Sequence, residues 1–177
     1  MTVLNPVTVF FPSPSGVVVG HADGAYVPIL GYRVTKVENI ETATGVDLFT
    51  VTGNVLITAW TGEVTNALHT TVTDYKLRVK TINADLCAAT NLSSAVVGYK
   101  FALSGDATKT ILTGSDYAVS LANVNSMKGL GFANRFIGSA AGTTTLQSLR
   151  TAGAAGDSLT HRVWYFPLEE NAIIVAA

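Results

Sequence analysis

The sequence predicts an all-β domain, an antiparallel β-sandwich of jelly-roll-like type, on three observations. Threonine and valine are abundant whereas glutamate and lysine are sparse, and β-branched side chains suit a pleated strand better than a helix. Roughly ten short apolar segments are separated by glycine, asparagine, aspartate and serine, as in sandwiches and barrels. The sequence lacks the alternation of strands and helices that would indicate a parallel α/β fold.

The chain begins with a segment, residues 1–15, that is expected to be an extended arm. Its three prolines, at positions 6, 12 and 14, exclude a regular helix and interrupt strand pairing, while "VTVFF" between them is strand-like. The arm either lies on a neighbouring subunit or forms the first edge strand of the same domain. Residues 16–177 form the predicted sandwich, a size typical of one domain.

The predicted strands of the sandwich follow in chain order and are separated by turn residues. They cover residues 16–20, 25–30, Tyr32–Ile40, Asp47–Thr52, Val55–Thr65, Asp74–Thr81, 85–90, 96–105, 110–114, 117–121, 159–168 and 172–177. Asp23-Gly24 and Gly53-Asn54 are predicted to be tight turns, and the second has the residues of a primed hairpin turn.

The strand that follows Gly53-Asn54 is apolar on both of its predicted faces. Strict alternation places Val55, Ile57 and Ala59 on one face and Leu56, Thr58 and Trp60 on the other. In a single sheet the second set would be exposed. We therefore expect one set to lie in the domain core and the other, including Leu56 and Trp60, at a subunit interface.

Residues 123–156 are rich in glycine, alanine, serine and threonine and are predicted to be one long loop. Within it, "TTTLQSLR" is expected to form one or two helical turns. Long ordered loops usually have a function, and this loop has almost no ionisable groups. Contact with a partner is therefore expected rather than chemistry, with Phe132 and Arg135 as candidate contacts.

No catalytic, cofactor-binding or metal-ligating residue is predicted. His21, His69 and His161 lack metal-ligand spacing and are expected at the surface or in turns. Neither a nucleophile elbow nor a phosphate-binding loop is present, and most carboxylates fall at turns. Cys87, the single cysteine, excludes an intrachain disulfide and is expected to be a small buried residue.

Charge is low over the whole chain. Only 13% of the residues are charged and the net charge is −1, whereas a soluble domain usually has about a quarter charged residues. Part of the surface is therefore expected to be covered by other chains. There is no basic run typical of a nucleic-acid binder and no apolar run of the ~20 residues that span a membrane.

Two short stretches are candidate surfaces. In "KLRVK", Lys76, Arg78 and Lys80 project from one face of a strand, either as a solvated face that protects an edge or as a basic stripe that docks on an acidic protein. In Trp164–Phe166, consecutive aromatic residues of one strand point to both faces of the sheet. The side chains on one face can join the core. Those on the other face are either covered by another sheet or subunit, or form a platform on which a carbohydrate stacks.

Three stretches together resemble a family of small structural proteins of tailed bacteriophages. They are "LFTVTGNVLITAWTGEVTNAL", "DLCAATNLSSAVVGYKFALSG" and "RVWYFPLEENAIIVAA", and they cover Leu48–Gly105 and Arg162–Ala177. The resemblance lies in their order and spacing; the N-terminal arm and the 123–156 segment do not match. It implies a β-rich virion protein on the outer surface of the head, a decoration or cement protein, made in the bacterial cytoplasm and without catalytic residues.

The resemblance also implies the partners. They are the major capsid protein of the same phage and further copies of the chain, which are expected to form a trimer. A neck, tail or fibre-base component and a lectin-like carbohydrate-binding module are the alternatives, and an enzyme is the least expected class. The expected capsid or subunit contacts are Val7, Val9, Phe10, Phe11, Leu56, Trp60, Lys76, Arg78, Lys80, Phe132 and Arg135.

Overall fold

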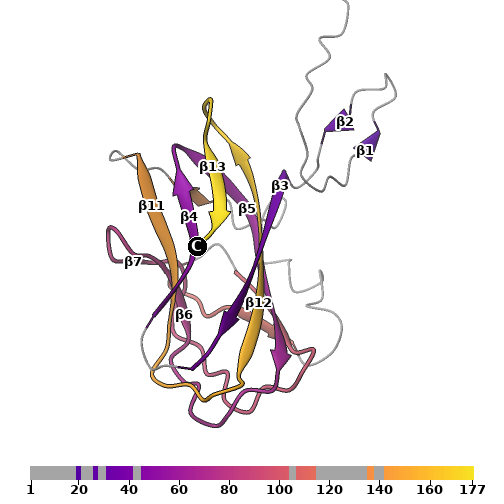
Figure 1. Cartoon of the computed structure of the whole chain (residues 1–177), viewed down its shortest axis with the longest axis vertical. Coiled ribbons are helices and arrows are strands. Elements are labelled where there is room, and N and C mark those ends of the chain that lie inside the picture. The colour runs from indigo at the N-terminus through magenta and orange to yellow at the C-terminus, as the bar shows by residue number, and fades with distance from the viewer. Residues whose placement is uncertain are drawn as a thin grey trace, which may run out of the picture.

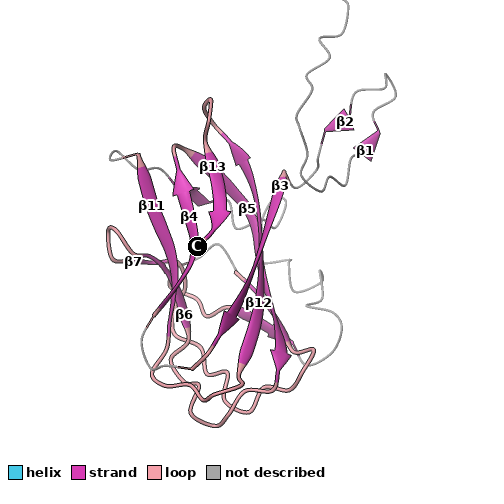
Figure 2. Cartoon of the chain, viewed as in Figure 1, coloured by secondary structure: helices cyan, strands magenta, loops and turns pink. Residues whose placement is uncertain are grey.

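The computed structural model describes residues 19–20, 26–27, 31–41, 45–103, 107–114, 135–137 and 142–177. In these residues the chain is all-β without a helix, and two antiparallel sheets form a sandwich (Figures 1 and 2). The predicted β-sandwich is confirmed. The arm of residues 1–15, the strand predicted at 117–121 and the candidate contact Phe132 lie outside the described residues.

One sheet has six strands and the other has five. The six-stranded sheet runs in the order β3 (Tyr32–Asn39), β12 (Ser158–Pro167), β5 (Val55–Asn66), β8 (Lys100–Ala102) and β9 (Leu112–Gly114), with β10 (Arg135–Ile137) also paired to β5. The five-stranded sheet runs in the order β13 (Ile173–Ala176), β4 (Val46–Thr52), β11 (Thr143–Leu149), β6 (Lys76–Val79) and β7 (Ala84–Asp85).

A separate antiparallel pair lies on either side of the predicted Asp23-Gly24 turn. Its strands are β1 (Val19–Gly20) and β2 (Tyr26–Val27).

The Gly53-Asn54 turn joins the two sheets and does not close a hairpin. Strand β4 before it pairs with β11 and β13, whereas β5 after it pairs with β12. Gly53 has the positive φ of 68° that the turn residues predict. The Glu169 carboxylate accepts hydrogen bonds from the Asn54 backbone N at 2.7 Å and from Asn54 Nδ2 at 2.9 Å. The predicted hairpin is wrong because contacts distant in sequence, not the turn, select the strand partners.

A β-bulge at Thr58 explains the apolar pattern of β5. In the β5–β12 ladder Tyr165 lies opposite Ile57 and Trp164 opposite Ala59, so Thr58 is the extra residue between these two pairs. One extra residue reverses the in–out alternation beyond it. Ile57 and Trp60 therefore both face the core, at 0% and 1% exposure. The prediction that Leu56, Thr58 and Trp60 share an outward face is wrong.

Part of the predicted 123–156 loop is a central strand. "TTTLQSL" forms β11 between β4 and β6, and β10 precedes it. The expected helical turns are wrong because consecutive β-branched residues favour a strand. The buried side chains Thr144, Leu146 and Ser148 also alternate along β11, as on the inner face of a sheet.

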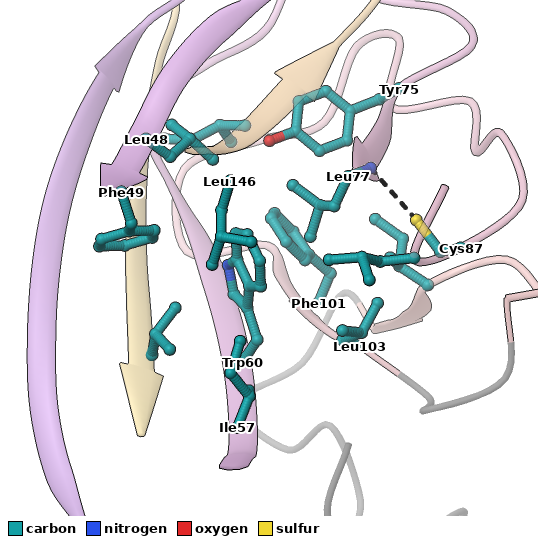
Figure 3. Close-up of a cluster of buried hydrophobic side chains, with 14 of the residues drawn as sticks. Leu48, Phe49, Ile57, Trp60, Tyr75, Leu77, Cys87, Phe101, Leu103 and Leu146 are labelled. Atoms are coloured by element: carbon teal, nitrogen blue, oxygen red, sulfur yellow. Dashed lines mark hydrogen bonds between the residues drawn. The ribbon is translucent and has the colours of Figure 1, made fainter. Parts of the chain in front are cut away.

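The hydrophobic core lies between the sheets (Figure 3). Phe49 of β4 meets Trp60 of β5 edge-on, with ring centroids 5.6 Å apart and an interplanar angle of 80°. Cys87 is fully buried, as predicted, and its Sγ accepts the Leu77 N–H at 3.3 Å. The buried Trp60 side chain is thus part of the core and not of a contact surface.

The two tryptophans of the chain form a matched pair for testing the bulge. Trp60→Ala is expected to lower the free energy of unfolding by about 3–5 kcal/mol because it leaves a cavity in the core. Trp164→Ala, on the half-buried outer face, is expected to lower it by less. Urea denaturation measures both.

Fluorescence gives a second measurement that does not depend on a stability change. In Trp164→Phe only Trp60 emits, and its emission is expected to be blue-shifted and almost insensitive to iodide. Strong quenching by iodide would show that Trp60 is open to solvent and would contradict the bulge.

Candidate functional site

A buried carboxylate, Glu38 of β3, connects the two sheets. Its Oε2 accepts hydrogen bonds from His161 Nε2 of β12 at 2.8 Å and from the Tyr75 hydroxyl at 2.9 Å. Its Oε1 accepts hydrogen bonds from the Ser148 hydroxyl of β11 and from Arg150 Nη1, the latter at 2.6 Å. We call these five residues the Glu38 network; each of them is at most 5% exposed.

The tautomer of His161 follows from its second ring nitrogen. Trp60 Nε1 lies 3.3 Å from His161 Nδ1, and an indole N–H can only donate. Nδ1 must therefore accept, so the ring proton is on Nε2 and is donated to Glu38. Glu38 and Arg150 then form the ion pair of the network.

The surroundings of Glu38 keep it ionised. Burial raises its pKa, but the hydrogen bond and the electrostatic attraction of His161, the hydrogen bond from Ser148 and the charge of Arg150 outweigh that effect, and the pKa lies below its ordinary value of 4.5. Burial and the neighbouring Glu38 carboxylate raise the pKa of Tyr75 well above its ordinary value. Tyr75 thus remains a hydrogen-bond donor.

The Glu38 network is buried in the core, and this indicates a structural role. Its five side chains bond to one another across the core, and Phe101 packs edge-on against the His161 ring at 5.7 Å. This arrangement holds the sheets together. The prediction that His161 lies at the surface or in a turn is wrong, since the side chain is fully buried. Sequence reasoning missed the network because its members are scattered along the chain.

A second polar contact lies at the end of the sandwich. Asp157 is 1% exposed and accepts hydrogen bonds from the His69 backbone N at 3.1 Å and from His69 Nδ1 at 2.5 Å. The His69 side chain is 62% exposed, as predicted for a surface residue. This contact ties the chain after β5 to the turn before β12. Within the described ranges, no group of three or more His, Cys, Asp or Glu residues is placed to hold a metal.

Lys76 and Arg78 of the predicted stripe lie on one face of β6, with Leu77 and Val79 buried behind them, and Lys80 directly follows the strand. Each cation is bonded to an oxygen nearby. The bonds are Lys76 Nζ to Asp85 at 2.7 Å, Arg78 Nε to Gln147 Oε1 at 3.0 Å and Lys80 Nζ to Asp47 at 2.8 Å. The face is therefore one of mixed charge, which favours the solvated interpretation over docking on an acidic protein.

The outer face of the six-stranded sheet has a cluster of half-buried apolar side chains. Phe166 lies opposite Leu56, and Trp164 lies opposite Ala59. Tyr165 between the two aromatic residues is in the core, so the three aromatics point to both faces as predicted. Leu56 remains a candidate contact, and we add Trp164 and Phe166 to it. Together with Ala59 these residues form the outer apolar patch.

Among the other predicted contacts are Arg135 and four residues of the N-terminal arm. Arg135 lies on β10 opposite Ile57 of β5. Val7, Val9, Phe10 and Phe11 precede the first described residue.

No family model matches the chain, and neither the curated proteins nor the solved structures include a match. In the part of the chain that the structure describes, no helix is long and apolar enough to cross a membrane.

Removing one partner of the buried ion pair tests the Glu38 network. Arg150→Met leaves the Glu38 charge buried without its counter-ion and is expected to lower the free energy of unfolding by about 3–5 kcal/mol. The matched control is Lys80→Met, which breaks an exposed pair and is expected to change it by less than about 1 kcal/mol. Equal effects in urea denaturation at pH 7 would contradict the role of the network.

The pH dependence of the free energy of unfolding tests the lowered pKa of Glu38. Its pKa is lower in the folded chain than its ordinary value of 4.5, so the stabilisation is present above pH 4.5 and is lost as the pH falls through the folded-state pKa. Glu38→Gln should remove this part of the pH dependence. The difference in unfolding free energy between wild type and Glu38→Gln is therefore expected to shrink on acidification below pH 4.5. A constant difference down to pH 2 would count against this assignment.

Proposed function

We propose that this protein is a non-enzymatic structural protein of a tailed-phage virion, a decoration or cement protein that binds the outer surface of the assembled capsid and stabilises it. One observation carries the proposal. The three stretches that resemble the phage family are neighbours in the sandwich. Strand β5 of the first pairs with β8 of the second and β12 of the third, and β4 pairs with β13.

This juxtaposition supports the proposal because the resembling stretches form one packed unit rather than scattered short matches. The proposal includes the finer expectations about the chain: a jelly-roll type of sandwich, residues 1–15 as an extended arm, and assembly as a homotrimer at the outer head surface after synthesis in the host cytoplasm.

The proposed mechanism is stabilisation by selective binding. A protein that binds the assembled lattice but not free capsid subunits shifts the equilibrium toward the lattice. Several weak contacts from one oligomer give avidity without a strong individual site. The candidate contacts are the arm, the outer apolar patch and the segment around Phe132 and Arg135, with the Lys76, Arg78 and Lys80 face as a weaker candidate.

Two alternatives remain distinguishable by experiment. A neck, tail or fibre-base component would be present only at one vertex of the particle, whereas a decoration protein would be spread over the head. The outward aromatics Trp164 and Phe166 favour a carbohydrate-binding module as a second candidate function. Binding to a glycan array, with or without calcium, would support that candidate instead.

Removal of residues 1–15 tests whether capsid binding needs the arm, either as a direct contact or through assembly of the oligomer. The truncated protein is expected to stay folded, with an unchanged near-UV circular dichroism spectrum, but to lose binding to purified phage heads in co-sedimentation. A full-length variant with Val7, Val9 and Phe11 changed to serine retains the arm length and the prolines, and should lose binding as well. Full occupancy of heads by both variants would eliminate the arm.

A further inference from the structure

Strand β3 is the longest strand at a sheet edge in the described part of the chain (Figure 1). It has 8 residues, whereas the edge strands β13, β9, β10 and β7 of the two sheets have 4, 3, 3 and 2. An edge strand presents unpaired N–H and C=O groups that can pair with another chain, and proteins usually keep such edges short or covered. The length of β3 therefore indicates a docking edge.

The register of β3 shows which backbone groups face outward. The Ile40 N–H donates to the Asp157 carbonyl at 2.8 Å and continues the ladder with β12 by one residue. In an antiparallel ladder only alternate residues bond to the same partner strand. The backbone groups of the other residues, Arg33, Thr35, Val37 and Asn39, therefore point to the free side.

These four residues are open in the described part of the chain. No other backbone there bonds to their N–H or C=O groups outside the ladder. Their side chains are exposed, and Val37 is 55% exposed.

The neighbouring edge of β13 differs because side chains of the six-stranded sheet cover it. The Tyr165 side chain hydrogen-bonds to the Ile174 backbone, and Lys36 Nζ donates to the Ala177 carbonyl. Among the described residues, no side chain covers the free edge of β3 in this way. Of the two edges on this side of the sandwich, β3 is thus the one that the described residues leave open.

The inner side of β3 indicates what kind of strand would fit. Tyr32 and Val34 pack against the core but remain half buried. An added strand would place alternate side chains over them and extend the core. The best occupant is therefore a short extended segment with apolar residues at every second position.

The chain contains such a segment ahead of β3. In V-T-V-F-F, Val7, Val9 and Phe11 alternate, and Pro6 and Pro12 limit the segment to a length shorter than β3. We propose that residues 7–11 of one copy pair as an additional strand with the free edge of β3 in a neighbouring copy. Every copy then both donates an arm and accepts one, a head-to-tail contact that forms a ring when the rotation between neighbouring copies closes. This inference rests on the self-association in the proposed function and not on capsid binding.

Cysteine cross-linking between two polypeptides tests the contact. Thr8→Cys and Val37→Cys proteins are prepared separately, one of them with nitrogen-15, mixed to allow exchange of subunits, and treated with a short bis-maleimide. With Val7 and Val9 on the inner side, Thr8 lies on the same outer face as the exposed Val37. Native Cys87 is buried and gives a low background. The matched control replaces Val37→Cys by Val96→Cys, another exposed valine at 59%. We expect about tenfold more linked dimer with Val37→Cys than with the control, because strand pairing raises the local concentration of one thiol near the other.

Other outcomes would overturn the proposal. A link only within one polypeptide of the Thr8→Cys/Val37→Cys double variant would assign the edge to the chain's own arm. A cross-link between two Val37→Cys chains would show that the edge pairs with β3 of a second copy. A yield of linked dimer no higher than that of the control would exclude the proposed contact. The assay contains no phage heads, so its result is independent of whether the protein binds capsids.

A backbone variant provides a second readout. Thr35→Pro removes an N–H that points to the free side and leaves the bonds to β12 in place. In the Val37→Cys protein this change is expected to lower the yield of linked dimer about tenfold, as the paired strand is lost. An unchanged yield would show that the arm does not pair through the β3 backbone.

Discussion

The hydrogen bonds of Glu38 are the constraint on which the rest of the sandwich depends. One buried carboxylate receives donors from β12, from β11 and from Tyr75 next to β6, so both sheets must be in register around it. A slip of one residue in any of these strands would turn a donor away and leave a charge unpaired in the core. Because Nε and Nη2 of Arg150 lack a hydrogen-bond partner among the described residues, the network specifies the arrangement more than it adds net stability.

The bulge at Thr58 and the Glu38 network depend on each other. The extra residue turns Trp60 inward, where its N–H reaches His161 and its ring packs on Phe49. His161 is thereby held in the tautomer that donates to Glu38. The same bulge leaves Leu56 and Ala59 on the outer face, beside the aromatic side chains Phe166 and Trp164. One local irregularity thus helps to form both the core and the outer apolar patch.

Two features of the structure support the proposed role. Several of the described carboxylates are bonded within the domain, and the backbone groups on one side of β3 face outward. The described carboxylates Glu38, Asp157 and Asp47 bond to partners inside the domain. The half-buried outer apolar patch and the edge of β3 face away from the core, and both are on the six-stranded sheet. Apolar surfaces and open edges favour binding to other protein chains, and this supports the proposed decoration role.

The sequence by itself determined most strand positions, the positive φ at Gly53, the two faces of "KLRVK" and the burial of Cys87, because these depend on residues close together in the chain. Only the tertiary structure decided that β4 and β5 belong to different sheets, that β11 is a strand and that Trp60 faces the core. Glu38 and His161 are 123 positions apart, and no local pattern pairs them. Strand partners and bulges are selected by the summed burial and hydrogen bonding of such distant residues, and this sum exists only once the sheets have packed.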